Sequence, residues 1–262
     1  MTGNNKNLIA IASGKGGVGK TWLSVTLAHL LARSGRSVLL FDGDIGLANV
    51  DVQLGITPKR DLGGVLSGRH TLKEAITQYP EGGFDIIAGR SGSASLATMP
   101  LEKLELIADA LRSLQNDYDF VLIDLGAGIE QHVQYLASIA SRCLVVLTDE
   151  PTSLTDAYAF IKIAQQYKAT NPTCKFVNSN PKPEINIVVN QAATQKEGEQ
   201  TYQAINKACS NFLGISPPLI GIVRRDNKVK DSIRNQKSLL IRAPHSTAAS
   251  DAALISIKLM QK

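Results

Sequence analysis

One stretch, SGKGGVGKTW at residues 13–22, constrains the fold more than any other part of this chain. It contains the pattern Gly14-x4-Gly19-Lys20-Thr21, and the apolar run LIAIA (8–12) comes directly before it. Such a loop works between a buried strand and the first turn of a helix, because backbone N–H groups and the helix N-terminus then converge on phosphate oxygens. The stretch therefore predicts a strand, a phosphate-binding loop and a helix, in that order.

Short apolar runs recur along the chain and alternate with helical patterns. Continuous apolar strands are typical of parallel sheets that are buried on both faces. Besides 8–12, the predicted strands are 37–42, 84–89, 119–124, 142–149, 185–190 and 218–223, and the predicted helices are 21–35, 101–115, 152–167 and 250–262. We expect the turn-rich segment 171–183 to be a surface connector. The order of elements predicts an α/β fold, a doubly wound, mostly parallel sheet flanked by helices.

Length and composition favour one soluble unit. The 262 residues are 44% hydrophobic, which suits a single domain over 1–262. No apolar run is long enough to cross a bilayer, so we expect a cytoplasmic protein. The cysteines Cys143, Cys174 and Cys209 form no Cys-x-x-Cys pair, which argues against a disulfide framework, a zinc site and an iron–sulfur cluster.

The glycine-rich loop predicts how a nucleoside triphosphate would be held. Its glycines let backbone N–H groups approach the phosphates, Lys20 reaches the outer phosphates, and the Thr21 hydroxyl ligates Mg²⁺. The predicted nucleotide-binding residues of this segment are Gly14, Lys15, Gly16, Gly17, Val18, Gly19, Lys20, Thr21 and Trp22.

Three aspartates at strand ends complete the predicted chemistry. Asp124 ends the run DFVLID, at the edge of the sheet where a metal-shell carboxylate beside the loop belongs. Asp42 ends another run and Asp44 follows it by two residues. We assign Asp42 to the Mg²⁺ shell and Asp44 to the orientation or deprotonation of the attacking water. An alternative is turn chemistry, in which Asp and Gly simply end a strand.

Positive charge is concentrated in one segment. Residues 224–242 contain seven basic and two acidic side chains, and thus supply the whole net charge of +5. Such a patch suits an anionic partner, whether phosphates, DNA or lipid headgroups, although a solvated helix face would also explain it. The final helix, 250–262, is expected to pack on the sheet, with membrane anchoring as the alternative.

These motifs resemble those of a known family. The sequence from Lys15 to Thr21 resembles the deviant Walker A motif of the MinD/ParA class of P-loop ATPases, and FDGDIGLANVDVQLG (41–55) is similar to their switch motif. Within that class, 126–162 looks most like the flagellar-number regulators of the FlhG/FleN group. Trp22 departs from the pattern, because a small hydroxyl residue usually stands there and touches the α-phosphate.

The resemblance implies roles that the residues alone do not establish. Lys15 would cross a nucleotide-sandwich homodimer and touch the partner's phosphates, in the manner of an arginine finger. Asn190 would lie at the adenine edge, with Arg225 and Asp226 near the base or ribose. Implied cofactors are ATP or ADP with Mg²⁺.

The leading hypothesis is an ATP-dependent dimerisation switch, with slow hydrolysis, that regulates the placement or number of a cell-surface structure, namely flagella. Implied partners are a signal-recognition-type GTPase, a transcription regulator or an anionic membrane surface. The alternatives are a ParA-like DNA- or cargo-partitioning ATPase that uses 224–242, a MinD-like division-site ATPase, a small-molecule ligase of the same fold, and a binder that does not hydrolyse ATP.

Overall fold

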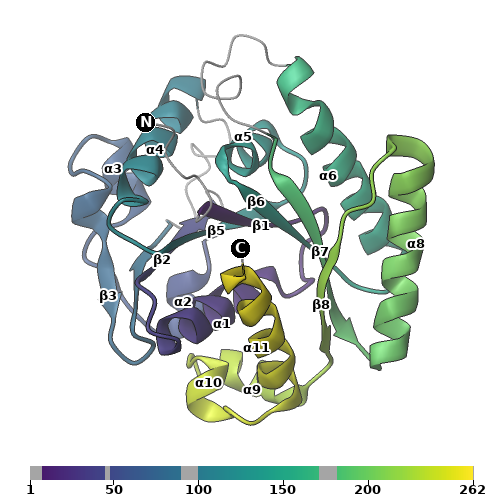
Figure 1. The fold of residues 1–262 in the computed structure, drawn as a ribbon. Coiled ribbons are helices and arrows are strands. Elements are labelled where there is room, and N and C mark those ends of the chain that lie inside the picture. Colours follow the sequence, from purple (N-terminus) through teal and green to yellow (C-terminus); the bar gives the residue numbers. More distant parts are fainter. Residues whose placement is uncertain (1–7, 45–47, 90–99, 171–181, 262) are drawn as a thin grey trace.

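The structure is a computed structural model that describes residues 8–44, 48–89, 100–170 and 182–261. Eight strands form one sheet in the order β3-β4-β2-β5-β1-β6-β7-β8 (Figure 1). Their bounds are β1 Leu8–Ser13, β2 Val38–Gly43, β3 Thr77–Tyr79, β4 Phe84–Ile87, β5 Phe120–Ala127, β6 Arg142–Leu147, β7 Glu184–Ala192 and β8 Leu219–Arg224. Every pairing is parallel except that of β3 with β4.

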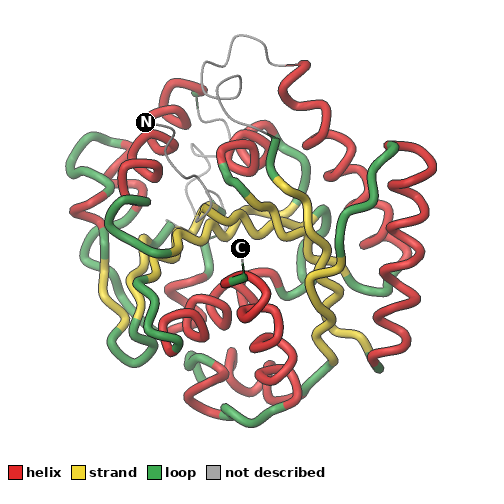
Figure 2. Tube along the Cα trace, viewed as in Figure 1, coloured by secondary structure: helices red, strands yellow, loops and turns green. Residues whose placement is uncertain are grey.

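Helices cover both faces of this sheet (Figure 2). The helices are α1 Lys20–Arg33, α2 Val50–Leu54, α3 Leu62–Leu66, α4 Leu101–Leu114, α5 Gln131–Ile139, α6 Pro151–Thr170, α8 Gln195–Leu213, α9 Asn227–Arg234, α10 Leu239–Arg242 and α11 Thr247–Met260, with a 3-10 turn at Lys73–Ala75. One core cluster joins the sheet to α4, α5, α6 and α8, and the other joins it to α1, α10 and α11. The predicted doubly wound α/β fold is therefore confirmed.

The central strand β1 explains why there are two cores. Leu8, Ala10 and Ala12 belong to one cluster, while Ile9 and Ile11 belong to the other. Successive side chains of a strand point to opposite faces, so a strand covered on both sides must be apolar at every position. All six residues of β1 are buried accordingly. This burial holds the end of β1, and with it the glycine-rich loop, in a fixed position.

The seven predicted strands are all present, and three predictions need comment. The edge strand β3 was not predicted, because its three residues carry no periodic signal. The last helix begins at Thr247 rather than 250, since the Ser246 hydroxyl accepts a hydrogen bond from the Ala249 N–H and caps it. Most of the predicted connector, 171–181, lies outside the described residues.

Helix α8 was also missed, for a physical reason. Its buried positions are Gly198, Thr201, Ile205 and Cys209, which are spaced correctly for a helix but are mostly small or polar. The helical period is thus present in the sequence, but the segment is polar overall and has few large apolar side chains to mark it. Across the described residues, no helix is both long and apolar enough to span a membrane.

The final helix packs on the sheet as predicted. α11 buries Ala248, Ala252, Ile255 and Leu259 in the core cluster that it shares with α1. At the edge strand, a Cβ added to Gly221 would lie 2.4 Å from Ile255 Cγ1. The absence of a side chain at Gly221 therefore lets α11 approach β8 closely.

Candidate functional site: a phosphate-binding cavity

The glycine-rich loop connects β1 to α1 and needs its glycines. Gly17 and Gly19 have φ values of 80° and 87°, a region that side chains other than glycine rarely adopt. A Cβ added to Gly14 would lie 2.1 Å from the Asp156 carbonyl oxygen, so the loop can pass α6 only with glycine there. The Ser13 hydroxyl closes the turn by donating to the Lys15 carbonyl over 3.0 Å.

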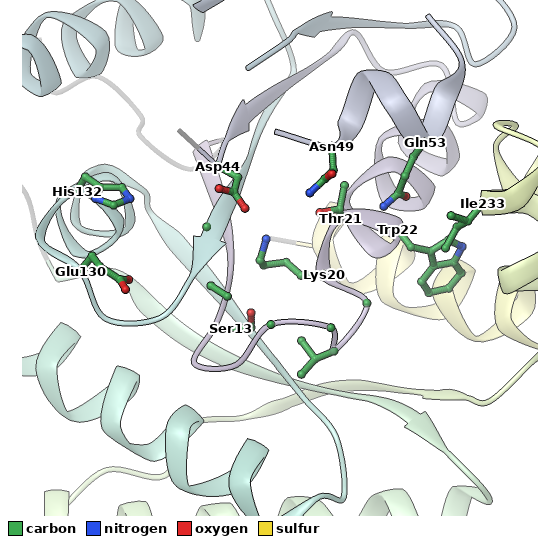
Figure 3. Close-up of a pocket in the computed structure, with 16 residues that line it drawn as sticks. Ser13, Lys20, Thr21, Trp22, Asp44, Asn49, Gln53, Glu130, His132 and Ile233 are labelled. Atoms are coloured by element: carbon green, nitrogen blue, oxygen red, sulfur yellow. The ribbon is translucent and has the colours of Figure 1, made fainter. Parts of the chain in front are cut away.

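This loop forms the floor of a cavity of about 650 Å³. Figure 3 shows the Lys20 side chain projecting from the loop toward Asp44. The cavity lies at the carboxyl ends of the parallel strands, where α/β sheets bind their ligands. Its lining consists of Ser13, Gly16, Gly17, Val18, Gly19, Lys20, Thr21, Trp22, Asp44, Asn49, Gln53, Gly126, Ala127, Glu130, His132 and Ile233.

Lys20 and Asp124 form a buried ion pair beneath the cavity. The Lys20 ammonium lies 3.1 Å from Asp124 Oδ1, and the two side chains are 7% and 1% exposed. The Ser24 hydroxyl donates to the same oxygen over 2.9 Å. The structure thus brings the predicted phosphate-binding lysine and the predicted metal-shell carboxylate together.

Asp42 lies beside Asp124, and its carboxylate holds a neighbouring loop. The two aspartates are partners in the β2–β5 register. Asp42 accepts hydrogen bonds from the backbone N–H groups of Asp44, Asn49 and Val50 at 3.0–3.2 Å. Complete burial, reinforced by the Asp124 charge, raises the pKa of Asp42 to about 7. Asp42 therefore anchors the start of the switch segment, and its place in the metal shell stays a prediction.

Asp44 reaches the cavity from the end of β2. A Cβ added to Gly126 would lie 3.5 Å from Asp44 Oδ1, so the carboxylate sits over the glycine at the end of β5. Asp44 and Thr21 line the same cavity as Lys20. Both residues thus lie beside Lys20, and their roles in hydrolysis and metal binding stay predictions.

Lys15 is part of the loop but does not line the cavity. Its ammonium forms an ion pair with Glu150 and donates to the Thr152 hydroxyl over 2.8 Å. Glu150 and Thr152 lie at the N-terminus of α6, and the interaction with Lys15 lowers the pKa of the Glu150 carboxyl. The second lysine of the loop is therefore held at the surface, away from the phosphates that Lys20 would bind.

Asn190 braces the loop instead of lining the cavity. Its amide donates to the Val18 carbonyl over 2.7 Å, and the Gln191 amide donates to the Gly17 carbonyl over 3.3 Å. A Cβ on Gly19 would lie 2.5 Å from Asn190 Nδ2. The predicted contact of Asn190 with adenine stays a prediction, while its structural role is plain.

Arg225 and Asp226 likewise lie outside the cavity lining. Asp226 caps α9 by accepting from the Lys228 N–H over 2.9 Å, and it ties α9 to α11 by accepting from the Ala248 N–H over 3.2 Å. The Arg225 side chain is exposed, and its backbone N–H donates to the Ala192 carbonyl. Their roles beside a base or ribose stay predictions.

Trp22 closes the far wall of the cavity, beside Gln53 and Ile233 (Figure 3). The side chain is 4% exposed, so it packs as part of the core while its edge borders the cavity. Trp22 therefore substitutes bulk for the small hydroxyl residue that the family resemblance implies at this position.

Several residues that line the cavity were not predicted from the sequence. Glu130 and His132 lie at the start of α5, and burial lowers the pKa of His132 although Glu130 and Asp44 oppose that shift. Asn49 and Gln53 come from the switch segment, and Ile233 comes from α9. Asn49 and Gln53 lie within the motif 41–55 that resembles the switch motif, whereas Glu130, His132 and Ile233 have no local signal and reach the cavity through tertiary packing.

The oxygen donors around this cavity suit Mg²⁺. They are the Thr21 hydroxyl, which lines the cavity, and the Asp124 carboxylate beneath it, while both oxygens of the neighbouring Asp42 already accept backbone N–H groups. Mg²⁺ usually takes only one or two protein ligands and completes its shell with water and phosphate oxygens. Accordingly, the described residues include no group of three or more histidine, cysteine or acidic side chains that would hold a metal alone.

Three of the seven basic side chains in 224–242 are neutralised. Arg224 pairs with Asp251, Lys237 with Glu81, and Arg242 with Asp231. Exposed basic side chains for which the structure gives no ion pair within the described residues are Arg225, Lys228, Lys230 and Arg234. The basic surface is thus smaller than the sequence count suggests, and it surrounds α9.

Comparisons with known proteins show the family of this chain. Residues 9–239 match the model of the CobQ/CobB/MinD/ParA nucleotide binding domain. The chain is 35% identical to the antiactivator FleN of Pseudomonas aeruginosa, covering 92% of this chain and 82% of FleN. It is 34% identical to the flagellum site-determining protein YlxH of Helicobacter pylori, covering 92% and 77%.

Among solved structures, the septum site-determining protein MinD of Pyrococcus horikoshii, complexed with Mg-ADP, superposes with a TM-score of 0.79. The alignment covers 97% of this chain and 96% of that one at 23% identity, and it supports the fold. Together with the glycine-rich loop, the buried Lys20–Asp124 pair and the family match, these findings establish that the chain belongs to the MinD/ParA family of P-loop nucleotide-binding ATPases.

Proposed function

We propose that this protein is an ATP-dependent dimerisation switch with slow, Mg²⁺-dependent hydrolysis of ATP to ADP and phosphate. The observation that carries the proposal is the position of Lys15. A lysine in a phosphate-binding loop would serve its own phosphates best inside the cavity, yet Lys15 is held outside it by Glu150 and Thr152. A cation placed at the rim is available to a second copy of the chain.

The cavity supplies the groups for hydrolysis. Lys20 would move from Asp124 to the outer phosphates, and the backbone N–H groups from Gly16 to Thr21 would hold the others. Asp44 would orient the attacking water and receive its proton. The bond between the γ-phosphorus and the oxygen that bridges it to the β-phosphate would break, and ADP would leave. Mg²⁺, when bound by Thr21 and the strand-end aspartates, would neutralise the developing charge on the phosphates.

Lys15 would complete this machinery only in a dimer. A cation that a second subunit delivers to a phosphoryl group stabilises the transition state, as an arginine finger does. The free loop would therefore bind ATP but hydrolyse it slowly. Hydrolysis would return the dimer to monomers, so the rate of hydrolysis would set the lifetime of the dimer.

The structure that this switch would regulate is the flagellum. Support comes from the similarity to FleN and to YlxH, whose names refer to antiactivation and to flagellum site determination. Both similarities extend over 92% of this chain. The partner would be a transcription regulator or a signal-recognition-type GTPase, and the protein would work in the cytoplasm or at the inner face of the membrane.

Size-exclusion chromatography with light scattering tests the switch directly. The wild type should be monomeric with ADP and dimeric with ATP and Mg²⁺. Lys20→Ala should stay monomeric because it does not bind nucleotide, and Lys15→Ala should stay monomeric although it still binds ATP. A dimer that forms equally with ADP, or one that survives Lys15→Ala, would refute the proposal.

A DNA-partitioning ATPase is the second candidate, and α9 is what favours it. Arg225, Lys228, Lys230 and Arg234 are exposed around this helix and form no ion pair with the part of the chain that the structure describes. ATP-dependent DNA binding that weakens with salt, and that Lys228→Glu with Lys230→Glu abolishes, would support this function. If the wild type instead binds anionic vesicles and the same charge reversal abolishes that binding, the surface would be assigned to a membrane.

A further inference from the structure

The Ser24 side chain contacts Asp124 but does not line the cavity. It lies on α1 one turn after Lys20, and residues four apart on a helix occupy the same face. Both side chains reach the same atom, Asp124 Oδ1, at 3.1 Å from the Lys20 ammonium and 2.9 Å from the Ser24 hydroxyl. One carboxylate oxygen therefore has two donors stacked along a single helix.

The two donors differ in what nucleotide binding would do to them. Bound phosphates would draw the Lys20 ammonium away from Asp124 and into the cavity, because the lysine of such a loop contacts the outer phosphates. Asp124 is 1% exposed, so water has little access to replace the lost donor. A buried carboxylate without a donor carries a large desolvation cost and a poorly defined orientation. Ser24 is fully buried and remains within hydrogen-bond distance.

The Ser24 hydroxyl has two acceptors within reach, and its role depends on which of them receives the hydrogen bond. The Lys20 carbonyl lies 3.1 Å away, the usual partner of a serine inside a helix. A hydroxyl has one proton and can donate it to only one acceptor at a time. The shorter distance and the negative charge favour Asp124, since hydrogen bonds to ionised groups are stronger.

We infer that Ser24 is a positioning residue for Asp124: it holds the carboxylate in place when Lys20 moves to the phosphates, so that the other oxygen stays directed toward the metal shell. This inference rests on the proposed nucleotide-binding function and adds to it. It assigns Ser24 to the Mg²⁺-dependent part of nucleotide binding and leaves the contacts between loop and phosphates to other residues.

A fluorescent nucleotide, mant-ATP, can separate these two parts. The affinity of the full-length protein is measured in buffer with MgCl2 and again with EDTA. Ser24→Ala should weaken binding about tenfold in MgCl2, the effect of losing a hydrogen bond to a charged group, and leave binding in EDTA unchanged. Ser24→Cys, which is slightly larger than serine and donates only weakly, should show the same selective loss and serves if Ser24→Ala does not fold.

Thr26→Val is the matched control. Thr26 lies on the same helix, is fully buried, and its hydroxyl donates to the Trp22 carbonyl over 2.8 Å. This variant should bind mant-ATP like the wild type in both buffers. Equal losses in MgCl2 and EDTA for the Ser24 variants, or no loss in either, would overturn the assignment while nucleotide binding stands. A wild type that binds no mant-ATP would overturn the proposed function itself, and this inference with it.

Discussion

Lys15 and Glu150 form an ion pair that joins the phosphate-binding loop to the N-terminus of α6, across 135 residues of sequence. In a monomer this contact occupies the one lysine that the proposed dimer needs. Both side chains are partly exposed, at 35% and 61%, so the pair is weak enough to exchange for a phosphate.

Glu150→Gln should therefore make dimerisation easier. The variant keeps the size of the side chain but removes the charge that holds Lys15. We expect the ATP-bound dimer to form at protein concentrations about threefold lower than for the wild type, in line with the small energies of exposed pairs. Analytical ultracentrifugation with ATP and Mg²⁺ measures this shift. Weaker dimerisation than in the wild type would show that Glu150 belongs to the dimer contact itself.

Asp44→Ala should trap the ATP-bound state. The carboxylate lines the cavity opposite Lys20, so its loss should lower the hydrolysis rate at least about 100-fold and leave ATP affinity nearly unchanged. Phosphate release measures the hydrolysis rate, mant-ATP titration measures the affinity, and size-exclusion chromatography shows whether the ATP-bound dimer accumulates. Asp51→Ala, in the same segment but outside the cavity lining, is the control and should hydrolyse ATP normally. An Asp44→Ala protein that stays monomeric with ATP would contradict the assigned role.

Asn190→Ala distinguishes a loop brace from a base contact. The amide donates to the Val18 carbonyl, so its removal should loosen the loop and weaken the binding of ATP and inorganic tripolyphosphate alike, by about fivefold. Competition against mant-ATP gives both affinities. A loss confined to ATP would instead support the contact with adenine that the family resemblance implies.

Trp22 offers an intrinsic signal for binding. It is the only tryptophan in the chain, it is 4% exposed, and it borders the cavity. ATP should change its emission intensity, because a charged ligand would alter the surroundings of the ring. Trp22→Phe removes the signal and should leave the fold intact, which identifies the source. Unchanged emission at saturating ATP would place the ligand elsewhere.

His29 should make stability depend on pH. Burial, with Arg33 nearby, lowers the pKa of His29 from 6.5 to about 4, and its Nδ1 lies 2.8 Å from the Ser238 hydroxyl. The unfolded chain thus binds more protons between pH 6.5 and 4 than the folded one. The stability contribution is complete above pH 6.5 and falls by about 3 kcal/mol toward pH 4.

Urea unfolding of the wild type and of His29→Gln isolates this effect. Asp42, with its pKa raised to about 7, acts in the opposite direction, because the folded state then binds the extra proton between pH 3.8 and 7. Since both proteins keep Asp42, the difference between them reports on His29 alone. Equal slopes of unfolding free energy against pH in the two proteins would contradict the assignment.

Much of the fold could be predicted because its signals are local. The strands of a sheet buried on both faces are continuous apolar runs, and β1 shows this at all six positions. Gly17 and Gly19 adopt positive φ angles, so the loop pattern reflects backbone geometry directly. The edge strand β3 lacks such a signal because it is only three residues long. Helix α8 has the helical period, but most of the side chains that it buries are small or polar.

By itself, therefore, the sequence determined the α/β class, the phosphate-binding loop and the strand-end aspartates, because each depends on spacing within a few residues. Only the tertiary structure decided what holds these parts in place. The pairing of Ser24 with Asp124, across 100 residues, and the brace between Asn190 and Val18, across 172, depend on which strands become neighbours. The physical reason is that a hydrogen bond requires two groups to lie within about 3 Å, and for residues so distant in sequence only the packing of the sheet and its helices sets that distance.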